Sequence, residues 1–348
     1  MKKTLLTLIF LFSIPLISFS QTLDQVKQDS REKISGGIEN VNELFCKVLP
    51  ENSSLLSLQP DSYIGKLFPS LPMHFTLGTS FSGTFIRTEK ITDSVKLLSE
   101  GISDTLNACG ATESINVDFT LPKNIPLPTA AFTARIGGII LPFDLGLYGM
   151  TTFNFINDIT VDDAEFSVEY STFGFDLRYA VYQGNILLPK ISIGAGYNYS
   201  KVGLDFATTK HFTANASYEL DGKTSSAGYE ADLTSDVSLS TSMHTIFLEA
   251  QVSKKLLVFE PYIGTKVFFT KTICDYDWKY NTVMENKVQE KLSDSDSKSE
   301  TSNFGENVST QFFGGVGITL LKFQIALNGA YNAKTDYWSC GVGFNLKI

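Results

Sequence analysis

The sequence is poor in the residue types on which most enzymes and metal sites depend. It contains only three histidines, His74, His211 and His244, and four cysteines in 348 residues. It has no H-E-x-x-H motif, nucleophile elbow or phosphate-binding glycine loop. The DSDS run at 294–297 lacks the glycine and the later glutamate of a calcium-binding loop, so it indicates a solvent-exposed loop. We therefore expect no enzymatic activity, no cofactor and no bound metal.

Basic residues are also scarce relative to acidic ones. Lys and Arg number 28 against 37 Asp and Glu, which gives a formal net charge of −9. Nucleic-acid binding depends on clustered basic side chains that displace the counterions of the phosphates. This acidic chain has no basic stripe, so nucleic acid is excluded as an expected partner.

After residue 20, no apolar run is long enough for a membrane-spanning helix, which needs about 20 apolar residues. The first residues, MKKTLLTLIFLFSIPLISFS, combine Lys2 and Lys3 with an apolar run that Pro15 interrupts, and they end in small serines. This pattern is typical of a cleavable export signal. We predict cleavage near Ser20, and a chain organised as a signal peptide over 1–20, a helical or plug segment over 21–71 and a β-barrel over 72–348.

What the sequence has in quantity is alternation of apolar and polar residues. In MHFTLGTSFSGTF, residues 73–85, most odd positions are apolar and most even positions are small and polar, which places the two sets on opposite faces of a strand. The polar face of such segments is mostly Gly, Ser, Thr and Asn, which favours a crowded lumen over open water. A secreted soluble β-sandwich also alternates and is the competing interpretation. The pattern predicts ten strands, at approximately 73–87, 128–138, 144–156, 165–182, 187–220, 225–253, 257–283, 307–320, 323–332 and 336–347.

The links between these strands alternate in length: 88–127 and 284–306 are long, whereas 253–256 and 320–322 are tight. Such alternation is typical of a membrane barrel with short periplasmic turns and longer outer loops. We predict an all-β fold, an antiparallel up-and-down transmembrane β-barrel of about 10 strands, or up to about 14. Since a closed sheet leaves no unpaired edge in lipid, residues 75–85 should pair with residues 340–346. The regions 187–220 and 225–253 should project outside as a tall hairpin, because about 9–11 residues cross the hydrocarbon.

The segment before the first strand has a different period. Apolar residues recur at helical spacing and predict one amphipathic helix, although glycines at 36 and 37 weaken its continuity. The segment would lie on the periplasmic side of the barrel, and two alternatives stay open: it enters the lumen from that side as a plug, or it remains free in the periplasm. The apolar face consists of Ile34, Ile38, Val41, Phe45 and Val48.

Charged residues on the predicted lumen face are the leading candidates for a functional site. Each lies opposite apolar neighbours in its strand, and at the middle of the membrane an Arg or Lys facing lipid costs about 2–4 kcal/mol. They are therefore expected to point inward and to pair. One interpretation is a structural salt-bridge network, which a narrow barrel favours; the other is a lining that contacts solute. The lumen-lining charged residues are Arg135, Asp176, Arg178, Glu249, Glu260 and Lys266.

The four cysteines permit one or two disulfides in an oxidising compartment. Their pairing cannot be deduced from spacing. Cys340 lies on the predicted lipid face and is expected to fill space, whereas Cys109, in the first long link, is the most favourable candidate for a bridge; the other two are Cys46 and Cys274.

The C-terminal residues WSCGVGFNLKI carry an apolar set that continues to Ile348. They resemble the last strand of bacterial outer-membrane barrels, although that strand usually ends in Phe or Trp. The resemblance implies location in the outer membrane of a bacterium with two membranes, contact with outer-membrane lipid, and recognition by the barrel-assembly machinery through this strand.

The order of helical segment and barrel is similar to that of the long-chain fatty acid channel family, whose barrels carry an N-terminal hatch. The start QTLDQV lacks the Asn-Pro-Ala of that hatch, and that family has fourteen strands. The similarity implies a channel or transporter for small hydrophobic or amphipathic solutes. The alternatives are a structural or surface-interaction barrel that binds through 88–127, 208–236 and 284–306, and the secreted soluble β-sandwich.

Overall fold

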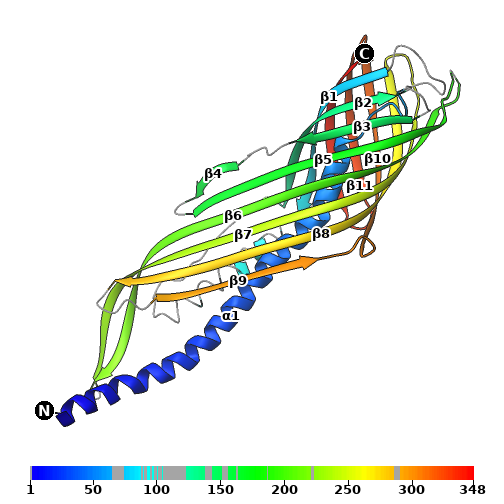
Figure 1. Ribbon diagram of the computed structural model, residues 1–348. Helices are drawn as coiled ribbons and strands as arrows, with labels where there is room; N and C mark the ends of the chain where they lie inside the picture. The colour runs from blue at the N-terminus through cyan, green and yellow to red at the C-terminus, as the bar shows by residue number, and fades with distance from the viewer. Residues whose placement is uncertain are drawn as a thin grey trace.

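The computed structural model describes residues 2–64, 74–87, 89, 92–94, 96–97, 100, 104, 123–137, 143–150, 156–161, 164–185, 187–220, 223–285 and 291–348. The predicted bridge at Cys109 lies outside these residues. Among the described residues, the named elements are one long helix, α1, and twelve strands that follow it (Figure 1). The elements are α1 (Lys2–Leu56), β1 (His74–Arg87), β2 (Asn124–Gly137), β3 (Phe143–Met150), β4 (Ile156–Val161), β5 (Ala164–Tyr182), β6 (Lys190–Leu220), β7 (Lys223–Ser253), β8 (Phe259–Glu285), β9 (Lys291–Thr301), β10 (Asn307–Leu320), β11 (Phe323–Asn332) and β12 (Tyr337–Lys347).

Ten of the strands form a closed antiparallel ring. The pairing order is β1, β2, β3, β5, β6, β7, β8, β10, β11 and β12, and β12 returns to β1. At this last seam Leu77 pairs with Leu346 and Gly83 with Cys340, so the predicted contact between residues 75–85 and 340–346 is confirmed. Closure gives every strand of the ring two neighbours, which is what a sheet in lipid requires.

The ten predicted strands correspond to the ten strands of the ring. The prediction missed β4 and β9, which lie outside the ring and pair only with β5 and β8. The link 284–306 is therefore not one continuous loop, and the interpretation of residues 294–297 as a loop was wrong. They lie within β9, because their alternation of serine with Asp or Lys is compatible with an exposed strand extending the edge of β8.

The ring places apolar side chains outside and polar side chains inside. On β11, Phe323, Ile325 and Leu327 are 67%, 43% and 50% exposed, whereas Gln324 and Asn328 face the lumen and are buried. The strand has 10 residues, which matches the 9–11 that cross the hydrocarbon. At its far end Tyr331 stacks against Trp338 of β12 with ring centroids 4.7 Å apart, as expected of an interfacial aromatic girdle.

This arrangement predicts a large penalty for charge on the outer face of β11. We expect Leu327→Arg to destabilise the barrel by about 2–4 kcal/mol in bilayers, because the guanidinium faces hydrocarbon at mid-depth. Asp275→Arg provides the control, since Asp275 is exposed on the part of β8 beyond the apolar band and should change stability by less than about 0.5 kcal/mol. Reversible unfolding in lipid vesicles measures both. Equal effects of the two substitutions would contradict the assignment of the apolar face to lipid.

The barrel wall is much taller on one side. β6 and β7 have 31 residues each and β8 has 27, whereas β11 has 10 and β12 has 11. The long strands continue beyond the ring as a curved sheet together with β5 and β9 (Figure 1). We call this the protruding end. The opposite end, where the tight turns at 254–258 and 321–322 lie, is the short-turn end. The predicted tall hairpin is confirmed as β6 and β7.

Helix α1 runs from the protruding end into the lumen. Glu39 forms an ion pair with Lys298 of β9 at the protruding end. Further along, Glu51 contacts Thr335 in the turn between β11 and β12, and the following chain brings Asp61 beside Lys347 at the short-turn end. The segment therefore enters the ring from the protruding end, whereas the prediction placed its entry at the end with the short turns. Helical period does not reveal direction, which is set by side-chain partners on strands far away in the sequence.

The predicted apolar face of α1 packs against the barrel wall. Ile34 and Ile38 are buried, and Phe45 joins Tyr148, Tyr170 and Met243 in one cluster. The helix continues through residues 36 and 37 without interruption, because tertiary packing outweighs the roughly 1 kcal/mol cost of a glycine in a helix. No part of α1 that the structure describes is long and apolar enough to cross a membrane as a helix.

Candidate functional site: the plugged lumen

The structure places all six predicted lumen charges inside the ring. Their exposed fractions are 8% or less, and they divide into three groups along the lumen. Each of the three groups also contacts the segment that follows α1 or the last turns of α1. The six residues are Arg135, Asp176, Arg178, Glu249, Glu260 and Lys266.

The first group centres on Asp144, at the start of β3. Its carboxylate accepts hydrogen bonds from Arg135 Nη1 at 2.8 Å and from Arg178 Nε and Nη2 at 2.9 and 2.7 Å. Arg135 Nη2 also donates to Asp176 Oδ2 at 2.7 Å. Two guanidiniums and two carboxylates thus neutralise one another where water is largely excluded, which is the condition under which buried charges are tolerated. A glycine at 146 makes room, since a Cβ there would lie 2.3 Å from Arg135 Nη2.

The second group holds the end of α1. Lys266 is fully buried on β8 and donates to the carbonyl oxygen of Ser54 at 3.0 Å and to Ser57 Oγ at 2.6 Å. Its ammonium also lies 3.3 Å from Glu249 Oε2 and 4.7 Å from the centre of the Phe247 ring. One cation therefore connects β7 and β8 of the wall to the chain inside the lumen.

The third group lies at the short-turn end. Asp61 follows α1 in the lumen, and its carboxylate is bound by Lys190 Nζ at 3.2 Å and by Lys347. Lys190 Nζ also lies 3.7 Å from Glu260 Oε1. Charges of both signs thus surround the chain at the point where it leaves the lumen.

Hydrogen bonds between uncharged groups also hold the chain after α1 against the barrel wall. Gln251 Nε2 donates to the carbonyl oxygen of Gln59 at 2.8 Å, and the backbone N–H of Ser62 donates to Ser253 Oγ at 3.1 Å. Residues 51–63 are buried throughout, so the end of α1 and the chain after it fill the lumen. We call residues 51–63 the plug. The three groups that contain the six predicted charges therefore surround a plug, and they do not line an open passage.

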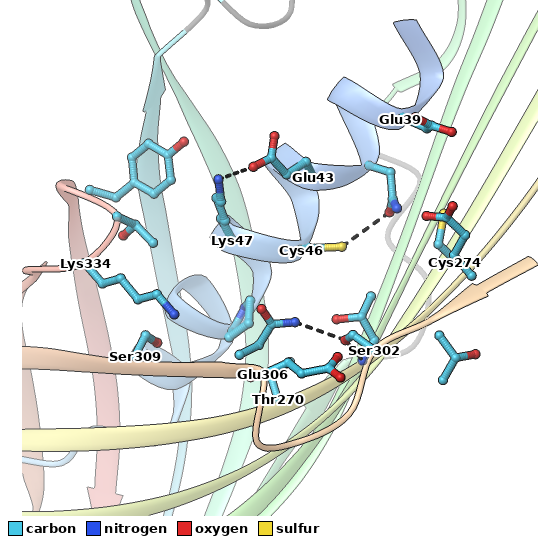
Figure 2. Close-up of a pocket in the computed structure, with 18 of the residues that line it drawn as sticks. Glu39, Glu43, Cys46, Lys47, Thr270, Cys274, Ser302, Glu306, Ser309 and Lys334 are labelled. Atoms are coloured by element: carbon cyan, nitrogen blue, oxygen red, sulfur yellow. Dashed lines mark hydrogen bonds and ion pairs between the residues drawn. The ribbon is translucent and has the colours of Figure 1, made fainter. Parts of the chain in front are cut away.

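A cavity of about 940 Å³ lies above the plug, between α1 and the wall (Figure 2). Figure 2 shows Glu43, Cys46 and Lys47 of α1 on one side and Thr270 and Cys274 of β8 on the other.

The cysteines at the cavity are not bridged. Cys46 Sγ donates to Asn42 Oδ1 at 3.4 Å. Cys46, Cys274 and Cys340 are free thiols, and Cys340 is exposed on the outer face of β12. Most groups lining the cavity are charged or hydroxylic, including Glu39, Glu300, Glu306, Ser302 and Lys334.

Glu51 is a buried carboxyl group at the outer end of the plug. Thr335 donates to its Oε1, and Oε2 has no hydrogen-bond partner within the described chain.

Sequence reasoning missed four charged residues of the network: Asp144, Asp61, Lys190 and Lys347. Asp144 carried a usable signal, because in FDLGLYG it alternates with apolar residues as the six predicted charges do. Lys190 is the first residue of its strand, where the alternation of apolar and polar residues only begins. At such a position the sequence does not show whether a side chain faces the lumen or belongs to the preceding turn. Asp61 belongs to the irregular chain after α1, which has no period from which to assign a face.

Solved structures similar to this chain are bacterial outer-membrane β-barrels. The outer membrane protease OmpT from Escherichia coli is 8% identical with a TM-score of 0.39, over 81% of this chain and 99% of that chain. A major outer membrane protein from Thermus thermophilus is 8% identical with a TM-score of 0.29, over 79% and 99%. A Pseudomonas aeruginosa FadL homologue is 9% identical with a TM-score of 0.21, over 82% and 95%. These likenesses concern the fold alone, and the predicted antiparallel barrel is confirmed by the closed ring of ten strands.

No curated protein sequence matches the chain. A family model described as Lsa36-like matches residues 68–347, which includes the whole ring.

Proposed function

The chain belongs to the Lsa36-like family, and from this premise and the plugged ring we propose that it is an outer-membrane channel for small amphipathic solutes. The fold points to the bacterial outer membrane. The observation that carries the proposal is that the plug is part of the same chain and that hydrogen bonds and ion pairs hold it to the wall in addition to the apolar contacts of Leu55, Leu56 and Leu58. Well-packed apolar residues often stabilise a buried site as well as an ion pair does, so a plug that served only to fill space would not need these polar contacts.

The cavity above the plug supports the choice of solute. Its volume of about 940 Å³ is in the range of small-molecule sites. Charged groups such as Glu43, Lys47 and Glu306 would bind the polar part of a solute, and Cys46, Pro50 and Tyr337 offer apolar contact. Glu43 and Lys47 pair with each other and Glu306 accepts from Asn303, so a purely hydrophobic solute would make few favourable contacts with this polar lining. We therefore narrow the solute class to amphipathic molecules.

Electrical recording in planar bilayers tests the proposal. The intact protein should show low or intermittent conductance, and deletion of residues 22–71 should give a stable, larger conductance because the plug is absent. Heat-modifiable gel mobility of both forms shows that the ring is folded. Equal conductance of the two folded forms would contradict a channel closed by its plug.

One observation favours a second function, a barrel that acts through surface contacts without transport. The protruding sheet of β5 to β9 is far taller than a channel requires, and polar and charged residues cover its edge strand, β9. In that case both forms would be non-conducting, and partner binding would be lost on shortening β6 and β7.

Export through the predicted signal peptide, with cleavage near Ser20, and insertion through contact of β12 with the barrel-assembly machinery remain part of this proposal. Accumulation in the outer membrane should be lost when the apolar residues of β12, including Phe344, are replaced by polar ones.

A further inference from the structure

We propose that the barrel displays its own N-terminal helix on the cell surface, with residues 28–47 of α1 outside and the plug crossing the lumen toward the periplasm. The protein would thus export a segment of its own chain through its ring. This inference depends on the membrane location but not on the passage of any solute.

The direction of the chain is fixed at three levels of the barrel. At the level of β9, Arg31 Nη2 contacts the carbonyl oxygen of Ser295 at 3.4 Å, and Lys298 Nζ lies 2.9 Å from Glu39 Oε1. At the level of the β11–β12 turn, Asn52 Nδ2 donates to the carbonyl oxygen of Leu127 at 2.8 Å. Because these contacts follow sequence order, α1 descends from the protruding end into the ring.

The chain then leaves the ring at the other end. The backbone N–H of Ile64 donates to Asp144 Oδ2 at 3.1 Å, and Arg178 Nη1 donates to the carbonyl oxygen of Asp61 at 2.8 Å. Asp144 and Lys347, which also contacts this segment, lie at the short-turn ends of β3 and β12. The segment from 51 to 64 therefore crosses the ring along its whole height, and β1 begins at the same end.

The sides of the membrane follow from the outer surface of the wall. Beyond the apolar band, the outward-facing positions of the tall strands become charged, as at Lys201 and Asp205 of β6 and at Asp275, Asp277 and Lys279 of β8. That part of the sheet stands in water. At the other end the turns are tight and lie next to the band, with Leu257 and Leu321 almost fully exposed at their tips. Outer-membrane barrels place short turns in the periplasm and long extensions outside, so the protruding end is external.

Helix α1 is adapted to this external position. Ile34 and Ile38 pack inward on the tall sheet, whereas Asp29, Glu32 and Glu43 are exposed to solvent. Residues 28–50 of a helix extend for about 33 Å at about 1.5 Å per residue. A segment of this length with charges along it cannot lie in the hydrocarbon, and the tall sheet provides the polar and apolar surface on which it rests.

Cysteine labelling on intact cells tests the inference. In a chain whose four native cysteines are replaced by alanine, single cysteines are introduced as Gln28→Cys, Lys279→Cys and Lys322→Cys. The first reports on α1, the second on the outward face of β8 and the third on the β10–β11 turn. A membrane-impermeant maleimide is applied before and after the outer membrane is permeabilised, and heat-modifiable mobility verifies that each variant is folded.

We expect Gln28→Cys and Lys279→Cys to be labelled on intact cells, and Lys322→Cys only after permeabilisation. Labelling of Lys279→Cys but not of Gln28→Cys on intact cells would show that α1 does not pass through the ring. Labelling of Lys322→Cys alone would show that the barrel has the opposite orientation. Either result overturns the inference and leaves the conductance test unaffected.

If the cysteine-free chain does not assemble, an epitope inserted after Gln28 in the natural sequence gives the same readout. Antibody binding to intact cells supports surface display. Binding only to permeabilised cells contradicts it.

Discussion

Replacing Asp144 with alanine should destabilise the barrel more than any other single change in the lumen. The carboxylate is fully buried and accepts hydrogen bonds from Arg135, Arg178 and the backbone N–H of Ile64. Its removal leaves buried guanidinium charge without compensation, which typically costs about 3–5 kcal/mol. We expect a loss of about 3–5 kcal/mol in the free energy of unfolding, measured by denaturant titration of the protein in detergent micelles.

Asp277→Ala is the matched control, since Asp277 is exposed on the outward face of β8 beyond the apolar band. It should change stability by less than about 0.5 kcal/mol. A second variant, Asp144→Asn, keeps the size and part of the hydrogen bonding but removes the charge, and should fall between the two. If Asp144→Ala and Asp277→Ala unfold at the same denaturant concentration, the network does not stabilise the fold.

Tying the plug to the wall should abolish conductance reversibly. The backbone N–H of Ser62 lies 3.1 Å from Ser253 Oγ, and both side chains are small and buried. The double variant Ser62→Cys with Ser253→Cys places two thiols on contacting residues of the plug and the wall, and oxidation should join them by a disulfide. We expect the oxidised form to remain closed in planar bilayers and the reduced form to open as the intact protein does.

The single variant Ser62→Cys controls for the substitution itself, and its conductance should not respond to reductant. The same comparison distinguishes a moving plug from a fixed one. Identical opening of the oxidised and reduced double variant, with the disulfide verified by mass, would mean that solute passes without displacement of residues 51–63.

The barrel was readable from the sequence because its determinants are local and periodic. Alternation assigned Leu77, Leu327 and Phe344 to the outer face, and the same rule assigned Arg135 and Lys266 to the lumen. The pairing of β1 with β12 followed from the physical need to remove sheet edges in lipid. These arguments require no knowledge of contacts between distant residues.

The features that the sequence did not predict depend on contacts between residues that are distant in the sequence. The plug binds through single polar partners, such as Lys266 with Ser57 and Ser62 with Ser253, whose positions follow no repeat. The direction of α1 depends on the pairing of Glu39 with Lys298, two exposed residues among many of their kind. β9 was missed because an alternating serine and charge pattern also suits a solvated loop. In each case the residues are visible in the sequence, but which residue contacts which is known only once the fold brings them together.

The presence of a helix within a ten-stranded ring restricts the order in which the chain folds. A closed ring of ten strands is narrow, so a charged helix would not readily pass through it after closure. The pairing of β1 with β12 joins the first and last strands of the barrel sequence. We therefore expect it to be the last step in the folding of the ring. The N-terminal residues, which are synthesised first, would then already lie inside the curved sheet when β1 pairs with β12. If β1 and β12 paired earlier, the barrel would close without its plug and would be misassembled.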